Sequence, residues 1–318
     1  METKTLKQLL KLIALILVLS YTIDKVAFFS LNAISDNVMS GQAIGKLNQF
    51  LKVKDTTNLL VFGNSRANHH IVVDKLNPNA YNMGINGIGI AYNSTLINTL
   101  NPKKKQTVIV HVDTKNFFND TYDGSDIRGL KTKYNRIDKI TSALNESGKI
   151  SSLQNIFYTM NYNGSAVGIL KNFIKPKYNH LSYNGYDPLV VSKSKTEVRD
   201  YMLKNDIAEK CTDNHKVNPT ALAFLEKIES FTEESKNNKT FIFVTSPIHN
   251  DACAVDNKIL ADILNKKNLT FWDFTNLYKT NNDDSSLWKD KTHMSNLGAE
   301  KFTTHLLKKY QAYTSTLK

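Results

Sequence analysis

Five short apolar segments alternate along this chain with longer segments of helical character, and this alternation restricts the fold more than any other feature. Helical patterns occupy residues 90–100, 219–235, 256–266 and 296–310. Short apolar runs are typical of buried strands, and strands that alternate with helices indicate a parallel sheet with both faces covered. We therefore expect an α/β domain with three layers and a five-stranded parallel sheet, with strands at residues 59–62, 80–83, 107–112, 240–244 and 269–274.

The alternation is interrupted after the third apolar run. Residues from about 117 to 235 are rich in Asn, Tyr, Lys and Ser and contain helical patches without a clear strand–helix repeat. We expect a largely helical insertion beside the carboxyl edge of the sheet, where lids and specificity elements tend to lie. A helical decoration that only covers the sheet is the alternative.

Residues 9–31 form the only segment of membrane scale, with an uninterrupted apolar core at 12–23. Lys11 and Lys25 lie near the ends of that core, where long side chains reach the lipid headgroups. We expect residues 1–33 to be a cytoplasmic tail and membrane anchor and residues 34–57 to be a linker with one short helix. The basic residues before the segment predict a cytoplasmic N-terminus and an extracytoplasmic domain. A signal peptide and a buried core helix are alternatives, although no small-x-small cleavage site follows Leu19.

Composition limits the classes of partner. The formal charge is +12, but only four of the 41 basic residues are Arg, and no zinc-finger or RNA-binding signature is present. We expect a solvated lysine-rich surface and no nucleic-acid partner. The two cysteines, Cys211 and Cys253, lie in no metal-binding motif. In an exported protein such a pair suggests a disulfide, which the sequence alone leaves open.

Two motifs at opposite ends of the domain carry the chemistry. Ser65 lies in Gly-Asn-Ser-Arg directly after the first apolar run, hence at the carboxyl end of a strand, where open α/β sheets bind their ligands. Asp290 precedes His293 by three residues, so the carboxylate can orient the imidazole as a general base for a serine. Taken alone, a helix N-cap serine explains the first motif equally well, and a polar residue near a helix start, with Asp290 as a cap, is the alternative for the second.

A glycine-rich segment, residues 81–89, follows the second apolar run. The bare N–H of Gly87 could donate to an oxyanion, and a turn that needs positive φ is the alternative explanation. Other histidines near these motifs carry weaker signals. We interpret His69 and His70 as surface or packing residues and His249 as a loop residue.

Together these motifs resemble those of the SGNH (GDSL-type) hydrolase superfamily of serine esterases and acyltransferases. Residues 63–66 are similar to the first block of the family, residues 82–87 to the second, and residues 290–299 to the fifth. The resemblance covers residues 58–113 and 240–310. It implies a flavodoxin-like fold over residues 58–318, a triad of Ser65, His293 and Asp290, and an oxyanion hole that includes the N–H groups of Ser65 and Gly87.

The third block departs from the family pattern. Members usually carry Gly-x-Asn-Asp after the third strand, and the Asn side chain completes the oxyanion hole. Here the strand leads into Asp113-Thr114-Lys115-Asn116. Asn116 can take that role if the loop is one residue longer, whereas an ionised Asp113 has no proton to donate.

The resemblance implies a serine esterase or O-acyltransferase that acts on acyl esters of envelope glycans or lipids, with no metal or organic cofactor. Membrane-anchored bacterial members with a similar first block are associated with polysaccharide O-acetylation. A non-catalytic SGNH-like protein that binds glycan, or that serves as a scaffold for a membrane acyltransferase, is the alternative hypothesis.

Overall fold

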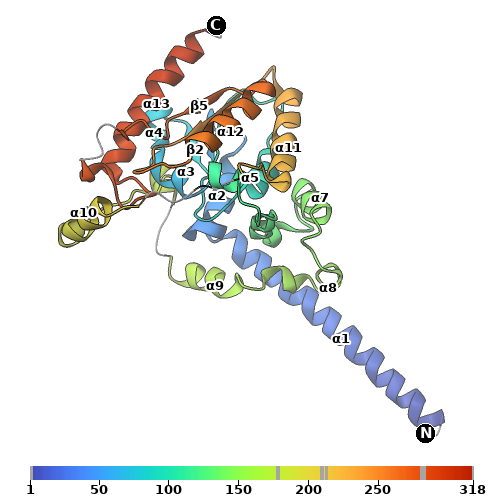
Figure 1. Ribbon diagram of the computed structural model, residues 1–318. Helices are drawn as coiled ribbons and strands as arrows, with labels where there is room; N and C mark the ends of the chain where they lie inside the picture. Colours follow the sequence, from blue (N-terminus) through green and yellow to red (C-terminus); the bar gives the residue numbers. More distant parts are fainter. Residues whose placement is uncertain (1–2, 177–179, 208–210, 212–213, 280–283, 317–318) are drawn as a thin grey trace.

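A five-stranded parallel sheet forms the centre of the protein (Figure 1). The computed structural model describes residues 3–176, 180–207, 211, 214–279 and 284–316. The strand order is β2-β1-β3-β4-β5, which confirms the predicted α/β fold and its five strands. The strands are β1 (Leu59–Phe62), β2 (Ala80–Asn82), β3 (Gln106–His111), β4 (Lys239–Thr245) and β5 (Phe271–Asp273).

Helices cover both faces of the sheet because side chains of a strand point alternately to opposite sides. In β1, Leu60 and Phe62 face one layer and Leu59 and Val61 face the other, and all four are fully buried. The first layer contains α2 (Lys46–Val53), α5 (Ile90–Ile97), α11 (Pro219–Ser235) and α12 (Ala254–Lys266). The second layer contains α3 (Ser65–His70), α4 (Val73–Leu76) and α13 (Asn296–Thr316).

The region expected as an insertion divides into two parts. Its last helix, α11, packs on α5 and belongs to the layer that covers the sheet. The part before α11 consists of short helices; three stretches of it, 177–179, 208–210 and 212–213, lie outside the described residues. The short α-helices are α6 (Thr114–Phe117), α7 (Asp138–Glu146), α8 (Ser152–Ile156), α9 (Ala166–Ile174) and α10 (Thr196–Lys204), and the 3-10 helices include η2 (Ser125–Lys133), η3 (Tyr158–Tyr162), η4 (His180–Tyr183) and η5 (Lys193–Lys195). A further 3-10 helix, η7 (Ser285–Leu287), precedes α13.

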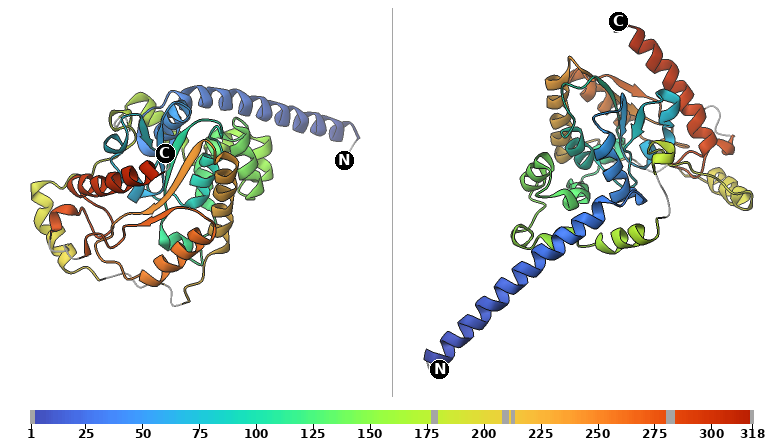
Figure 2. Two further views of the ribbon diagram at one scale, coloured as in Figure 1. Left: turned by 90° about the horizontal axis from the view of Figure 1, so that it is seen from above. Right: turned by 180° about the vertical axis from the view of Figure 1, so that it is seen from behind.

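The N-terminal helix α1 (Thr3–Asp36) extends away from the domain (Figure 2). It is long and apolar enough to cross a membrane, and only 11% of its most apolar window is buried. A buried core helix is therefore the wrong interpretation of this segment, whereas a membrane anchor and a signal sequence both remain compatible with it.

Residues 34–57, expected as a linker with one short helix, are part of the folded domain. The π-helix η1 (Gly41–Gly45) leads directly into α2, whose Leu47 and Phe50 are fully buried in the core beneath β1. The helix α1 itself continues to Asp36 and packs on η3 and α9. The chain therefore passes from α1 into the sheet through packed structure.

A substitution at Gly298, near the start of α13, can test how tightly the segment after His293 is packed. A Cβ atom at Gly298 would lie 2.0 Å from the carbonyl oxygen of Leu287, so Gly298→Ala must displace backbone. We expect it to lower the free energy of unfolding by about 1–3 kcal/mol, as overpacking does. The urea unfolding midpoint of the full chain in detergent measures this loss.

Gly168→Ala is the matched control, because the added methyl group meets nothing within 4 Å and the residue lies inside α9. This variant should be neutral or more stable by about 0.5–1 kcal/mol. Equal midpoints for the two variants would contradict the close approach of α13 to η7.

Candidate active site

Ser65 is the first residue of α3, directly after the turn that leaves β1. Asn64 is the N-cap, and its Oδ1 accepts a hydrogen bond from the backbone N–H of Arg66 at 2.9 Å. Gly63 has a φ of 149°, and a Cβ there would lie 2.7 Å from the Cβ of Ala67 and 2.8 Å from that of His111. The tight approach of β3 and α3 therefore needs glycine before the N-cap, and this turn presents Ser65 at the edge of the sheet.

His293 and Asp290 lie against Ser65 in the arrangement that the sequence predicts. The Nε2 atom of His293 is 2.9 Å from the Oγ of Ser65, and its Nδ1 atom is 3.1 Å from both carboxylate oxygens of Asp290. The carboxylate accepts a hydrogen bond from the N–H of Nδ1, which leaves the lone pair of Nε2 for the serine hydroxyl. The three side chains thus form a continuous hydrogen-bonded chain from carboxylate to hydroxyl.

Asp290 is held in the charged form that this series of hydrogen bonds needs. Partial burial disfavours the carboxylate, but hydrogen bonds from His293 and from the backbone N–H of Thr292 outweigh it and lower the pKa of Asp290. Its Oδ1 also accepts the backbone N–H groups of Thr292 at 2.9 Å and His293 at 2.8 Å. The same carboxylate therefore shapes the loop and orients the imidazole.

A buried polar network supports the residue after His293. The Nε2 of His70 accepts the backbone N–H of Met294 at 3.0 Å, so the proton of the neutral ring is on Nδ1, 2.7 Å from the Oγ of Ser246. The Ser246 hydroxyl is then free to donate to the Nε2 of His111, 3.0 Å away. Burial lowers the pKa of His70 and of His111 well below the usual value, which keeps both rings neutral.

His69 and His249 make no hydrogen bond to Ser65. His69 is buried, its Nδ1 lies 2.7 Å from the carbonyl oxygen of Asp187, and its ring packs edge-on to that of His293 at 5.6 Å between centroids. His249 is also buried and lies 3.2 Å from a carboxylate oxygen of Asp206. The sequence left open whether His69 and His70 are surface or packing residues. Both are buried, so they are packing residues.

Ser65, Gly87 and Asn116 line one open cleft of about 520 Å³. Gly87 has a φ of 72° and no atom within 4 Å of where a Cβ would lie, so a ligand can approach its backbone closely. Asn116 belongs to α6, and its side-chain amide makes no hydrogen bond to any other described residue. The three groups expected to form an oxyanion hole therefore border the same space.

Asp113 and Asn64 form a hydrogen-bonded pair at the base of this cleft. The Nδ2 of Asn64 donates to the Oδ2 of Asp113 at 2.6 Å, and the Oδ1 of Asp113 accepts the N–H of Lys115 at 3.1 Å as the N-cap of α6. Asp113 thus acts as an acceptor with both oxygens. It positions Asn64 and α6 and has no proton for an oxyanion.

The far wall of the cleft is polar and comes from the loop after α6, which the sequence motifs did not single out. It carries hydroxyl, amide and carboxylate groups. The Oδ2 of Asp126 accepts the N–H groups of Gly89 and Tyr92 and thereby joins this wall to the glycine-rich segment. In the sequence, the one sign of this polar wall was a run of polar residues after a predicted strand. The wall residues are Asn119, Thr121, Tyr122, Asp123, Ser125 and Asp126.

A metal site finds little support within the described part of the chain. The one group of suitable side chains there is Cys211, Cys253 and Asp256. The two cysteines form a disulfide with their Cα atoms 5.5 Å apart, so their sulfur atoms are not thiolate ligands. The pairing that the sequence left open is therefore present in the structure.

Comparisons with known proteins add no assignment. No model of a protein family matches the chain, and no curated protein matches its sequence. The functional argument therefore rests on the residues and their geometry.

The pair of Asn64 and Asp113 gives a test of the cleft's electrostatics. Asn64→Asp would place two carboxylates in hydrogen-bond contact, and we expect a loss of about 1–3 kcal/mol in the free energy of unfolding at pH 7. Repulsion raises the pKa of one carboxyl in the folded variant, so the loss should shrink as the pH falls and that group takes up a proton.

The control is the exchanged pair, Asn64→Asp with Asp113→Asn, which keeps one amide and one carboxylate in contact and should recover most of the stability. Thermal unfolding of the four proteins of this cycle measures the coupling. If the exchanged pair is as unstable as the single variant, the hydrogen bond between residues 64 and 113 does not govern this site.

Proposed function

We propose that this protein is a serine esterase or O-acyltransferase of the SGNH type that acts on acyl esters of cell-envelope glycans. The observation that carries the proposal is the hydrogen-bonded chain from Asp290 through His293 to Ser65. A serine hydroxyl next to a correctly oriented imidazole is the arrangement that nucleophilic acyl transfer requires.

In the proposed reaction the Oγ of Ser65 attacks the ester carbonyl while the Nε2 of His293 takes its proton. The tetrahedral oxyanion is stabilised by the N–H groups of Ser65 and Gly87 and by the amide of Asn116. His293 then returns the proton to the leaving alkoxide, which yields an acyl-enzyme. Water completes an esterase cycle, and a sugar hydroxyl completes an acyltransferase cycle.

The chemistry of the cleft favours a glycan over a lipid as the acylated molecule. Its wall presents amide, hydroxyl and carboxylate groups in place of the continuous apolar surface that an acyl chain would need. Sugar hydroxyls can donate to Asp123 and Asp126 and accept from the amide groups of Asn116 and Asn119. We place this domain on the extracytoplasmic side of a membrane that α1 crosses, within reach of envelope polymers.

A non-catalytic role in glycan binding, or as a scaffold for a membrane acyltransferase, is the second candidate. It is favoured by Asp113, which stands after β3 where the third block of the resembling family offers an amide donor. A carboxylate beside the cleft disfavours the negative charge that develops on a bound ester when a nucleophile attacks it. The two candidates differ in whether Ser65 reacts.

A fluorophosphonate probe on the full chain in detergent separates the two. We expect the probe to label the protein, and expect Ser65→Ala and His293→Ala to abolish labelling. Asp290→Asn should slow it by about 10⁴-fold, because the imidazole tautomer is no longer fixed. Ser125→Ala is the control, since Ser125 lines the same cleft without a histidine partner and should label normally. A folded protein that resists labelling would favour the binding role.

Asn116 provides a separate test of the oxyanion hole. We expect Asn116→Ala to lower the hydrolysis rate of a small acetyl ester by about 10²–10³-fold, since one donor to the oxyanion is lost. Asn119→Ala, in the exposed wall of the same cleft, should change the rate little. Equal effects of the two substitutions would remove Asn116 from the proposed oxyanion hole.

A further inference from the structure

An apolar surface is exposed on the short helices that pack beside α1. Val167 and Ile174 of α9 are 80% and 78% exposed, and Leu170 and Phe173 of the same helix and Leu153 and Ile156 of α8 are also exposed. We call these six residues the apolar face. A soluble domain rarely leaves so many large apolar side chains together in water, so the surface suggests contact with another apolar phase.

The contacts of these helices with α1 begin at Asp24 and Lys25. The carboxylate of Asp24 accepts the N–H groups of Tyr158 at 2.8 Å and Thr159 at 3.0 Å, and Lys25 donates to the carbonyl oxygen of Ile156. Farther along α1, Phe28 packs with Tyr162 and Ile169 in a small buried cluster. The packed part of α1 therefore begins at Asp24.

Before Asp24 the helix is exposed throughout its described side chains, from residue 5 to residue 23. At 1.5 Å per residue this free segment is about 28 Å long, close to the thickness of the hydrocarbon core of a bilayer, about 30 Å. If the free segment spans the core, the lipid headgroups lie at Asp24 and Lys25, beside α8 and η3.

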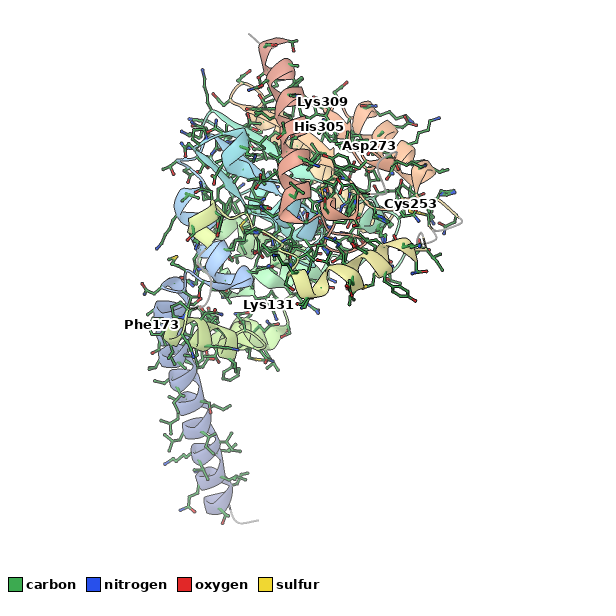
Figure 3. The ribbon with its side chains drawn as sticks, turned by 90° about the vertical axis from the view of Figure 1, so that its left-hand side faces the viewer. Lys131, Phe173, Cys253, Asp273, His305 and Lys309 are labelled. Atoms are coloured by element: carbon green, nitrogen blue, oxygen red, sulfur yellow. A yellow bond between two sulfur atoms is a disulfide. The ribbon has the colours of Figure 1, made fainter. Side chains whose placement is uncertain are left out.

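The orientation of α9 directs the apolar face toward that boundary. Asn172 accepts a hydrogen bond from the Oγ of Ser40 at 3.2 Å, on the side of α9 that faces the domain. With about 100° of rotation per residue, Val167, Leu170 and Ile174 form a stripe on the opposite side of the helix. Figure 3 shows Phe173 on α9 beside α1, below the bulk of the domain in that view.

The charges around the apolar face suit a lipid surface. Between Glu146 and Asp187 the sequence has no acidic residue, whereas Lys149, Lys171 and Lys175 are present. Lys25 lies 4.5 Å from the ring centroid of Tyr21 and 3.4 Å from that of Tyr158. Aromatic rings with lysines are typical of the membrane–water interface, and lysines attract anionic headgroups.

We propose that α8, η3 and α9 lie in the interface of the bilayer that α1 crosses and bind an anionic lipid surface through the apolar face and its lysines. This second contact would fix the orientation of the domain on the membrane. The proposal rests on the membrane anchoring included in the proposed function and is independent of catalysis.

Depth-dependent fluorescence quenching tests this contact with the full chain in vesicles of phosphatidylcholine and phosphatidylglycerol. A fluorophore on Val167→Cys should be quenched by lipids spin-labelled at shallow positions, at a depth of about 5–10 Å below the headgroups. The native cysteines are held in their disulfide and do not take the label. Because Val167 is 80% exposed, the substitution leaves the packing intact.

Two matched positions make the result decisive. Val198 on α10 is likewise apolar and is 60% exposed. A fluorophore on Val198→Cys should stay unquenched. Leu15→Cys in the free part of α1 should be quenched by deep spin labels. Quenching at residue 15 without quenching at residue 167 would overturn the proposal, as would equal quenching at residues 167 and 198. The absence of quenching at residue 15 would overturn both this proposal and the membrane anchoring on which it rests. Fluorophosphonate labelling of the same samples reports on the proposed reaction independently.

Discussion

The pairing of β1 with β2 on one side and β3 on the other is the constraint on which the site depends. Leu59 stands opposite both Ala80 of β2 and Thr107 of β3, and every side chain of β1 is fully buried. Parallel pairing brings the ends of all three strands to one edge, where the chain order reverses around β1. The residues that follow these strands, Ser65, Gly87 and Asn116, must therefore border a common space.

Polar groups behind this edge form a second layer of constraint. The neutral rings of His70 and His111 share the hydroxyl of Ser246, and His70 also holds the backbone N–H of Met294. The loop that carries His293 is thereby tied to α3, which carries Ser65. Since buried polar groups are costly when unpaired, a shift of either element would leave several of them unsatisfied. The distance between Ser65 and His293 is thus fixed by buried polar groups that join their two segments behind the cleft.

The sequence predicted well what local pattern determines. Four-residue runs such as Leu59–Phe62 could only be buried strands in this alternation, and Asp290 is near enough in sequence to His293 for their contact to be anticipated. Contacts between distant segments carried no comparable signal. Asp24 and Tyr158 are 134 residues apart, and nothing periodic in either segment predicts their pairing. The role of residues 34–57 was missed for the same reason, because amphipathic spacing shows that α2 is a helix without showing what it covers.

The packed continuation of α1 into the domain bears on which substrates the site can reach. A flexible linker after residue 33 would let the domain sample a wide volume above a membrane. Instead, α1 runs unbroken to Asp36, Lys133 and Arg136 of the neighbouring segment form ion pairs with that aspartate, and α2 enters the core soon afterwards. If α1 spans a membrane as proposed, a domain held in this way keeps its cleft at a nearly constant height above the lipid surface. The proposed enzyme would then be suited to polymers that are drawn past it, or delivered by a partner in the same membrane, rather than to small molecules captured from solution.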